Sequence, residues 1–77
     1  EQIQKKFIFK NFDLAIEFFN LVAEAADAQN HHPDILNSYC TIKISLTTHD
    51  EKKITEKDLI LASKIDKIFG NFIGNEK

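Results

Sequence analysis

The sequence contains few of the residues that interrupt or cross-link a chain. Among its 77 residues are one cysteine, one proline and two glycines, and it has neither tryptophan nor methionine. The lone Cys40 has no partner for a disulfide within the chain, so a reducing, intracellular compartment fits best. The scarcity of proline and glycine agrees with the absence of any linker, internal repeat or low-complexity segment.

Excess positive charge and long apolar runs are also missing. Ten basic residues stand against twelve acidic ones, which gives a net charge of -2. The only adjacent lysines are two short pairs of the kind that solvated surfaces carry, so we expect no direct binding to nucleic acid. The chain has no apolar run of membrane-spanning length and no signal peptide, which predicts no contact with a membrane.

The apolar content that is present is enough for a folded core. Apolar residues make up 43% of the chain, and seven of them are phenylalanines. This content suits one compact domain over residues 1–77. A chain this small buries only about 60% of its unfolded surface. Its core therefore gains from self-association, and we expect a homodimer or a homotetramer.

Hydrophobic periodicity predicts a strand and then a helix in the first half of the chain. In residues 2–10 apolar and polar positions alternate: Ile3, Phe7 and Phe9 against Gln4, Lys6 and Lys10. Asn11 is a suitable N-cap for the helix that follows, and Asp13 places a carboxylate near its positive end. This helix is expected to reach about Gln29.

The apolar arc of this helix is wide. Two stripes run side by side, and the polar side is narrow: Glu17, Asn20, Glu24 and Asp27. One sheet face does not need so broad an arc, so we infer a second partner for the helix, either the other helix or another subunit.

The second half of the chain predicts extended segments and a final helix. Apolar and polar residues alternate strictly over residues 39–47, which would make Cys40 a small core side chain. With the shorter extended piece at residues 34–38, this allows either a turn near Asn37 and Ser38 or one long bent strand. Thr55 and Asp58 resemble a capping box that opens a helix, and Gly70 or Gly74 is expected to end it.

The resulting order is strand, helix, one or two strands, helix, without the repetition that a parallel sheet requires. The simplest way to bury these elements is an α+β fold, in which an antiparallel sheet carries two long helices on one face. An exposed strand edge of that sheet would invite pairing with a second copy.

Two of the three histidines lie side by side in QNHHPD, residues 29–34. Proline disfavours the helical conformation for the residue before it, so His32 must leave the helix and Pro33 fixes where the imidazoles turn outward. His49 lies at the far end of the strand at 39–47. If the helix end and this strand end meet, three imidazoles gather around one ligand. The unperturbed pKa of imidazole is about 6.5. A cluster of three imidazoles therefore implies proton transfer near neutral pH.

Three other interpretations use the same region. His31 and His32 can simply cap the helix C-terminus, where positive charge is favourable, with His49 as a surface residue. A zinc site is disfavoured because adjacent histidines do not converge easily on one ion, and no Cys or His cluster completes it. Ser45, His49 and Asp50 contain the letters of a hydrolase triad but lack a nucleophile elbow.

A longer pattern includes these histidines. An acidic residue, His-His-Pro, an aromatic residue, a histidine and an aspartate follow at set spacings: Asp27, His31, His32, Pro33, Tyr39, His49 and Asp58. In type and spacing this pattern resembles the signature region of the pterin-4a-carbinolamine dehydratases. The family's strand and first long helix are similar to the flanking stretch KKFIFKNFDLAIEFFNLVAEAA, and its last helix is similar to LILASKID. The likeness covers nearly the whole chain.

The resemblance implies a dehydration. A 4a-hydroxytetrahydropterin, made by aromatic amino acid hydroxylases, loses water to give a quinonoid dihydropterin. Expelling the hydroxyl needs a proton delivered to the leaving oxygen, and the new double bond needs a proton removed from a ring nitrogen. The resemblance gives these acid and base roles to His31 and His49, in either order, and substrate orientation to His32. No metal or redox cofactor is required, because dehydration transfers no electrons and the pterin is itself the substrate.

The resemblance also implies a set of substrate-binding residues: Asp27, Pro33, Thr47, Thr48 and Asp50. Asp27 is expected to orient an imidazole, and backbone groups around Thr47 and Thr48 to bind the flat, polar edge of the pterin. Asp58 is better explained as a helix cap than as a catalyst.

The sequence departs from the family pattern at three points. Ile35 stands where the family commonly has tryptophan, and residues 51–53 lack the glycine that is usual after the third histidine. Family members also typically begin with an additional helix and strand. We therefore expect an N-terminally truncated version of the family's four-stranded sheet, without its first strand and N-terminal helix.

A binding role is the alternative to catalysis. Proteins that resemble this family also act as dimerisation cofactors and coactivators for transcription factors, using a helical face. The apolar stripes of residues 12–26 suit a transcription-factor partner or a homotetramer equally well. The three histidines favour the enzyme, since a scaffold needs none of them. We expect a cytoplasmic protein, and also a nuclear one if the coactivator role applies.

Overall fold

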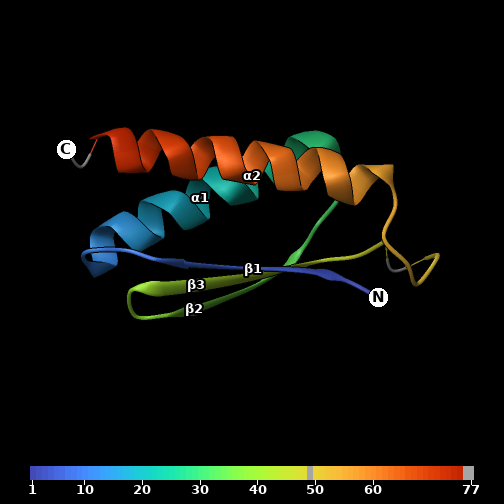
Figure 1. Cartoon of the computed structure of the whole chain (residues 1–77), viewed down its shortest axis with the longest axis horizontal. Helices are drawn as coiled ribbons and strands as arrows, with labels where there is room; N and C mark the ends of the chain where they lie inside the picture. Colours follow the sequence, from blue (N-terminus) through green and yellow to red (C-terminus); the bar gives the residue numbers. More distant parts are fainter. Residues whose placement is uncertain (49, 76–77) are drawn as a thin grey trace.

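Two helices lie over one face of a three-stranded sheet (Figure 1). The computed structural model describes the backbone of residues 1–48 and 50–75 and the side chains of residues 1–48 and 50–72. The elements in chain order are β1 (Ile3–Ile8), α1 (Phe12–Gln29), β2 (Asp34–Ser38), β3 (Thr41–Leu46) and α2 (Glu56–Asn75). The end of α1, the exit from β3 and the beginning of α2 all lie at the same end of the molecule.

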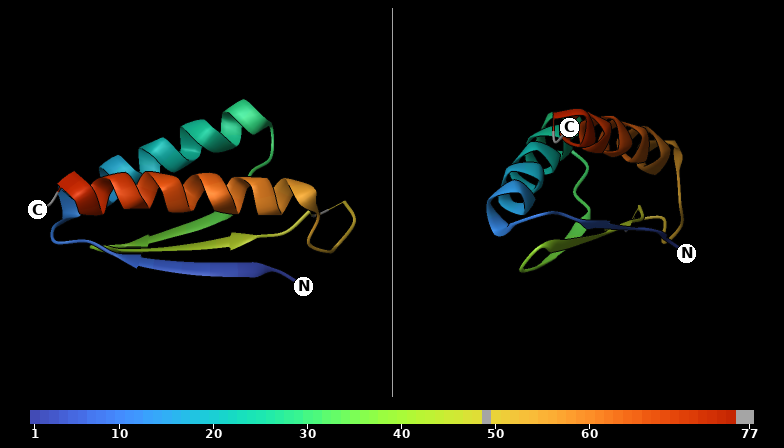
Figure 2. Two further views of the ribbon diagram at one scale, coloured as in Figure 1. Left: turned by 45° about the horizontal axis from the view of Figure 1, so that its top comes forward. Right: turned by 60° about the vertical axis from the view of Figure 1, so that its left-hand side comes forward.

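The sheet is antiparallel, with β3 between β1 and β2. Ile3 pairs with Leu46 at one end of the β1–β3 ladder, and Asp34 pairs with Ser45 in the β2–β3 ladder. Figure 2 shows both helices on the same side of the strands, with the other sheet face uncovered. The predicted α+β fold, an antiparallel sheet with both helices on one face, is confirmed.

The turn between β2 and β3 lies two residues later than the sequence suggested. Ser38 pairs with Thr41, so Tyr39 and Cys40 form a two-residue loop. Tyr39 has a φ of 54°, a left-handed conformation that side chains other than glycine and asparagine rarely adopt. Cys40 is half-buried in this loop, and its carbonyl accepts a hydrogen bond from Phe9 N–H. The alternation had predicted Cys40 to be a core residue of the strand, and this prediction is wrong.

The start of α1 follows the sequence prediction. Asn11 Oδ1 accepts a hydrogen bond from Leu14 N–H at 2.9 Å, which satisfies one of the donors that a helix N-terminus leaves free. Asp13 lies in the first turn of the helix. The helix then packs against both the sheet and α2, which explains the width of its apolar arc.

The second helix does not end at Gly70, and its last residue lies one position beyond Gly74, the other expected end. It begins after Thr55 and continues through Gly70 to Asn75. A glycine inside a helix costs about 1 kcal/mol, and the apolar residues Ile68, Phe69 and Phe72, which pack against the core on either side of Gly70, outweigh that cost. Neither helix, over the residues that the structure describes, has the length and apolar character needed to cross a membrane.

Aromatic side chains form the centre of the core. Phe18 is fully buried, and its ring centroid lies 4.9 Å from that of Phe7 and 5.0 Å from that of Phe9, both on the β1 side. On the α2 side the centroids of Phe69 and Phe72 lie 5.9 and 5.8 Å away. Phe18 therefore joins the sheet to both helices.

We predict that Phe18→Ala lowers the free energy of unfolding by about 3–5 kcal/mol, because it leaves a cavity where three elements meet. Phe12→Ala is the matched control on the same helix, since Phe12 is 45% exposed; we expect it to cost about 1 kcal/mol or less. Urea unfolding followed by circular dichroism measures both. Similar losses for the two variants would contradict the central position of Phe18.

Candidate functional site

The two adjacent histidines follow the end of α1. Asn30 has φ 54° and ψ 42°, and its N–H reaches the carbonyls of Ala26 and Asp27. His31 N–H bonds the Ala26 carbonyl at 3.1 Å, which completes a left-handed cap of the Schellman type. The left-handed Asn30 therefore ends the helix. Pro33 restricts His32 two residues later and is not needed to end it. The cap turns the chain so that His31 and His32 leave the helix in succession.

His31 is held by a buried aspartate from the other helix. Its Nε2 lies 2.6 Å from Oδ1 of Asp58, in the first turn of α2. The side chain of His31 is 10% exposed, and that of Asp58 is 0% exposed. An ionised carboxylate only accepts hydrogen bonds, so this contact places a proton on Nε2 and leaves Nδ1 as the ring nitrogen able to exchange protons.

Asp58 is held in turn by two threonines. Thr48 Oγ1 and Thr55 N–H each donate to Asp58 Oδ2 at 2.9 Å. The contact with Thr55 is the half of a capping box in which the carboxylate reaches back to the residue before the helix. Asp58 is therefore the helix cap that the sequence predicted and, at the same time, the partner of His31.

Burial and hydrogen bonding act on Asp58 in opposite directions. Burial alone raises the pKa of its carboxyl, because the ionised form loses hydration. Hydrogen bonds from His31, Thr55 and Thr48, together with the charge of His31, outweigh burial and hold the pKa of Asp58 below its ordinary value. Asp58 is consequently ionised at neutral pH.

His32 has a more exposed carboxylate partner. Its Nε2 lies 2.8 Å from Oδ1 of Asp27, and the two side chains are 62% and 78% exposed. Asp27 therefore lies where it can orient His32, in a contact that water and salt weaken.

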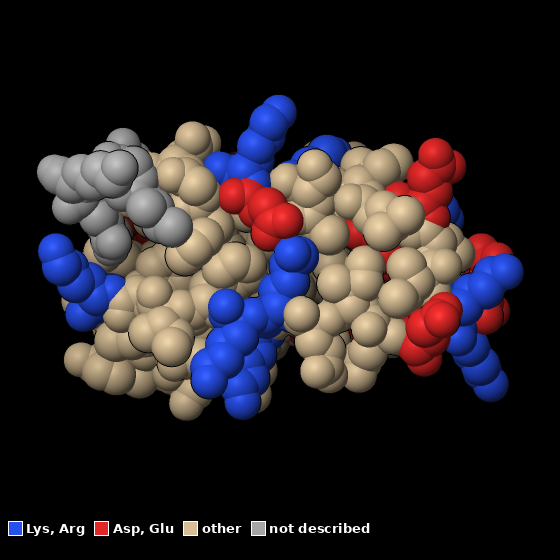
Figure 3. Space-filling model, viewed as in Figure 1, with Lys and Arg blue, Asp and Glu red and all other residues tan. Residues whose placement is uncertain are grey.

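A hollow of about 230 Å³ opens beside these side chains. It is lined by Asn30, His31, His32 and Asp50. Asp50 belongs to the loop between β3 and α2, so the hollow joins the end of α1 to the segment that follows β3. Figure 3 shows acidic and basic side chains gathered at this end of the molecule. His49 lies outside the described residues.

The other three predicted residues, Pro33, Thr47 and Thr48, do not line this hollow. Thr47 Oγ1 donates to the Glu1 carbonyl at 2.8 Å and borders a separate hollow with Glu1, Gln2 and Lys52. Thr48 is 5% exposed, and its hydroxyl donates to Asp58. Pro33 is half-buried between His32 and β2.

The loop after β3 forms a turn without glycine. Thr48 N–H bonds the Lys53 carbonyl at 3.0 Å, and Glu51 N–H bonds the Thr48 carbonyl at 3.1 Å. Lys52 has a φ of 53° and takes the left-handed conformation that glycine adopts most easily. Residues 51–53 therefore form a tight turn even though they lack the glycine that is usual in the family.

A family profile described as pterin 4 alpha carbinolamine dehydratase matches residues 1–68. The chain belongs to this family. A protein of Herpetosiphon aurantiacus, provisionally named as a pterin-4-alpha-carbinolamine dehydratase, is 53% identical over 88% of this chain and 71% of its own length. A protein of Picosynechococcus with the same provisional name is 48% identical over 87% of this chain and 73% of its own.

Two solved structures have the same fold. The crystal structure of a transcriptional coactivator/pterin dehydratase from Brucella melitensis matches with a TM-score of 0.85 and 37% identity, over 88% of this chain and 72% of that one. A pterin dehydratase-like protein identified as a RuBisCO assembly factor of the alpha-carboxysome matches with a TM-score of 0.75 over 87% of this chain and 77% of that one. At 19% identity, this second likeness concerns the fold alone.

Two features of this candidate site were not predicted from the sequence. Asp58 was predicted mainly as a helix cap, because an aspartate at the third position after Thr55 gives no sign of a partner 27 residues away. Asn30, which ends α1 and lines the hollow, was given no role. The QN before the histidines offered the only signal, since asparagine is the commonest residue after glycine in a left-handed helix cap.

We predict an acid-dependent loss of stability that depends on Asp58. Because its pKa is lower in the folded state, ionised Asp58 stabilises the fold above the ordinary aspartate pKa of about 3.9, and this stabilisation disappears as the pH falls through the lower folded value. At pH 7, Asp58→Asn should cost about 1–3 kcal/mol. It should also flatten the decline of stability as the pH falls below about 4.

Urea unfolding at a series of pH values measures this contribution. Asp34→Asn is the control, because Asp34 is exposed at the start of β2 and should retain the acid dependence of the wild type. An Asp58→Asn protein with the same acid dependence as the wild type would show that Asp58 is not the group that titrates.

Proposed function

We propose that the chain catalyses the dehydration of a 4a-hydroxytetrahydropterin to a quinonoid dihydropterin and water, in the recycling of tetrahydrobiopterin. Membership of the dehydratase family supports the reaction class. The observation that carries the proposal is the hollow in which His31, backed by ionised Asp58, lies beside His32 and Asp50.

The geometry suits His31 to proton exchange. With Nε2 bonded to Asp58, Nδ1 can take the proton that leaves the pterin ring nitrogen, and the carboxylate then stabilises the charged ring. An acid must also protonate the departing hydroxyl, and we assign this role to His49. His32, tied to Asp27, binds and orients the substrate.

Asp50 gives the hollow a carboxylate for the polar edge of the pterin. The substrate carries N–H donors on one edge of a flat bicyclic ring, and a carboxylate accepts such donors without needing a proton of its own. The N–H and carbonyl of Thr48 already bond Lys53 and Glu51, so the binding edge proposed near Thr47 and Thr48 does not include these two groups. Pro33 holds the chain that carries His32. The pterin is the only small molecule that this reaction requires.

We predict that His31→Ala and His49→Ala each lower the rate of carbinolamine decay by about 100-fold or more, since each removes a group that transfers a proton. The carbinolamine is generated by phenylalanine hydroxylase turnover and followed by ultraviolet absorbance. Gln4→Ala, a truncation of an exposed residue on β1, is the control and should behave as the wild type.

A non-catalytic role as a dimerisation cofactor is the second candidate function. The Brucella relative is described as a coactivator as well as a dehydratase, and the helices of this chain expose apolar surface that a partner can cover. Equal decay rates for the wild type, His31→Ala and His49→Ala would favour this scaffold over the enzyme.

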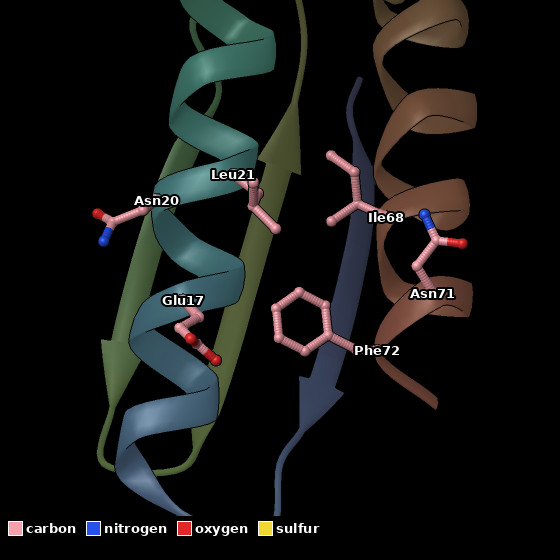
Figure 4. A pocket seen from close by; sticks show the side chains of 6 residues that line it. All are labelled: Glu17, Asn20, Leu21, Ile68, Asn71 and Phe72. Carbon is pink, nitrogen blue, oxygen red and sulfur yellow. The ribbon is translucent and has the colours of Figure 1, made fainter. Parts of the chain in front are cut away.

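We further propose that the chain self-associates through a groove between the helices. The groove has a volume of about 500 Å³ and is lined by Glu17, Asn20, Leu21, Ile68, Asn71 and Phe72. Figure 4 shows Leu21 on α1 and Phe72 on α2 turned toward the gap between the helices. Leu21 is 42% exposed there, although it is a large apolar side chain.

Charge on the two rims favours a second copy as the occupant. Every charged residue of α1 is acidic: Asp13, Glu17, Glu24 and Asp27. On α2, Lys64 and Lys67 lie one turn before Ile68 and Asn71 and so share the groove side of the helix. A two-fold axis through the groove would bring the acidic rim of each copy to the basic rim of the other.

We predict that Leu21→Glu shifts the protein toward monomer, because it places a charge in the apolar centre of this interface. Leu36→Glu is the matched control, since Leu36 is 59% exposed on the strand β2, away from the groove. Sedimentation velocity measures the oligomeric state. Association that persists in Leu21→Glu and is lost in Leu36→Glu would place the interface on the sheet instead.

A further inference from the structure

We propose that Thr48 is a positioning residue, whose hydroxyl sets the orientation of Asp58 and, through it, the ring of His31. The inference rests on the proposed dehydratase function only for its kinetic consequence. Thr48 lies two residues beyond β3 and is 5% exposed, so its hydroxyl is not free to meet a substrate.

The hydrogen bonds around Thr48 have a single consistent direction. Thr48 Oγ1 donates to Asp58 Oδ2 at 2.9 Å, and this uses its one proton. The 2.6 Å contact between Thr48 Oγ1 and Thr55 Oγ1 must then be donated by Thr55. Protons therefore point from Thr55 to Thr48 and from Thr48 to the carboxylate, and each bond polarises the next.

This chain of bonds divides the two oxygens of Asp58 between two tasks. Oδ2 receives Thr48 Oγ1 and Thr55 N–H, both from the segment before α2. Oδ1 receives His31 Nε2 from the end of α1. A carboxylate is planar, so fixing Oδ2 also fixes the position of Oδ1. Without the Thr48 hydroxyl, the Thr55 N–H would be the one remaining donor to Oδ2 among the described residues.

The backbone of Thr48 acts on the opposite wall of the hollow. Its N–H and carbonyl close the turn with Lys53 and Glu51, and this turn carries Asp50 to the lining. One residue thus holds His31 through its side chain and Asp50 through its main chain. The side chain can be changed while the backbone hydrogen bonds remain, which makes the hydroxyl separately testable.

The test replaces the hydroxyl and keeps the shape of the side chain. Thr48→Val retains the β-branch and removes the donor, and Thr48→Ser retains the donor. Thr41→Val makes the same replacement on β3, away from Asp58. Carbon-13 NMR follows the titration of the Asp58 carboxyl, and nitrogen-15 NMR reports which nitrogen of His31 carries the proton. Neither readout requires dehydratase activity.

We expect Thr48→Val to raise the pKa of Asp58 and to populate both tautomers of His31. Its kcat should fall about tenfold, less than the loss of the histidine itself, while KM stays within about twofold because substrate contacts remain. Thr48→Ser and Thr41→Val should match the wild type in both NMR readouts. An unchanged Asp58 titration in folded Thr48→Val would overturn the proposal.

Two further outcomes remain decisive. If the NMR changes occur as expected while the wild type does not accelerate carbinolamine decay, the positioning role stands and the proposed function fails. If Thr48→Val does not fold, Thr55→Val removes the preceding donor and should raise the pKa of Asp58 by a smaller amount. No change in that variant would likewise overturn the role of the threonine chain.

Discussion

The hydrogen bond between His31 and Asp58 is the contact on which the rest of the site depends. It joins the segment that follows α1 to the first turn of α2, and Thr48 extends the connection to the end of β3. Three elements that are distant in the sequence thus meet at one buried carboxylate. Gln29 adds a second tie between the same helices, because its Nε2 donates to the Lys57 carbonyl at 2.7 Å.

Burying a carboxylate lowers the stability of a small domain unless the lost hydration is replaced. Removing an unpaired charge from water costs several kcal/mol, comparable to the whole stability of many domains at about 5–15 kcal/mol. Asp58 is tolerable because His31, Thr48 and Thr55 replace the water that it loses. The same donors that offset burial also fix the carboxylate, so the arrangement that makes the fold possible presents His31 to the hollow in a defined tautomer.

The sequence predicted the elements better than the points where the chain turns. The helices and strands followed from periodicity, since the apolar residues that repeat there are the ones the core buries. The turn at Tyr39 and Cys40 was missed because a tyrosine in a left-handed conformation has none of the usual turn chemistry. Asn37 explains how it forms: its side-chain amide donates to the Tyr39 carbonyl at 3.2 Å. This contact spans only two residues, but the alternation of apolar and polar side chains does not encode it.

The site shows the same division between local and long-range information. The histidine pair and its position after a helix were readable from the sequence, because the cap and Pro33 act within a few residues. The pairing of His31 with Asp58 was not, because it depends on how α2 packs beside α1 on the same face of the sheet. Any substitution that tilts α2 will therefore move Asp58 relative to His31 without touching either residue. Core residues such as Phe18 can in this way influence proton transfer at a hollow that they do not line, and loss of activity in a core variant must be interpreted together with its stability.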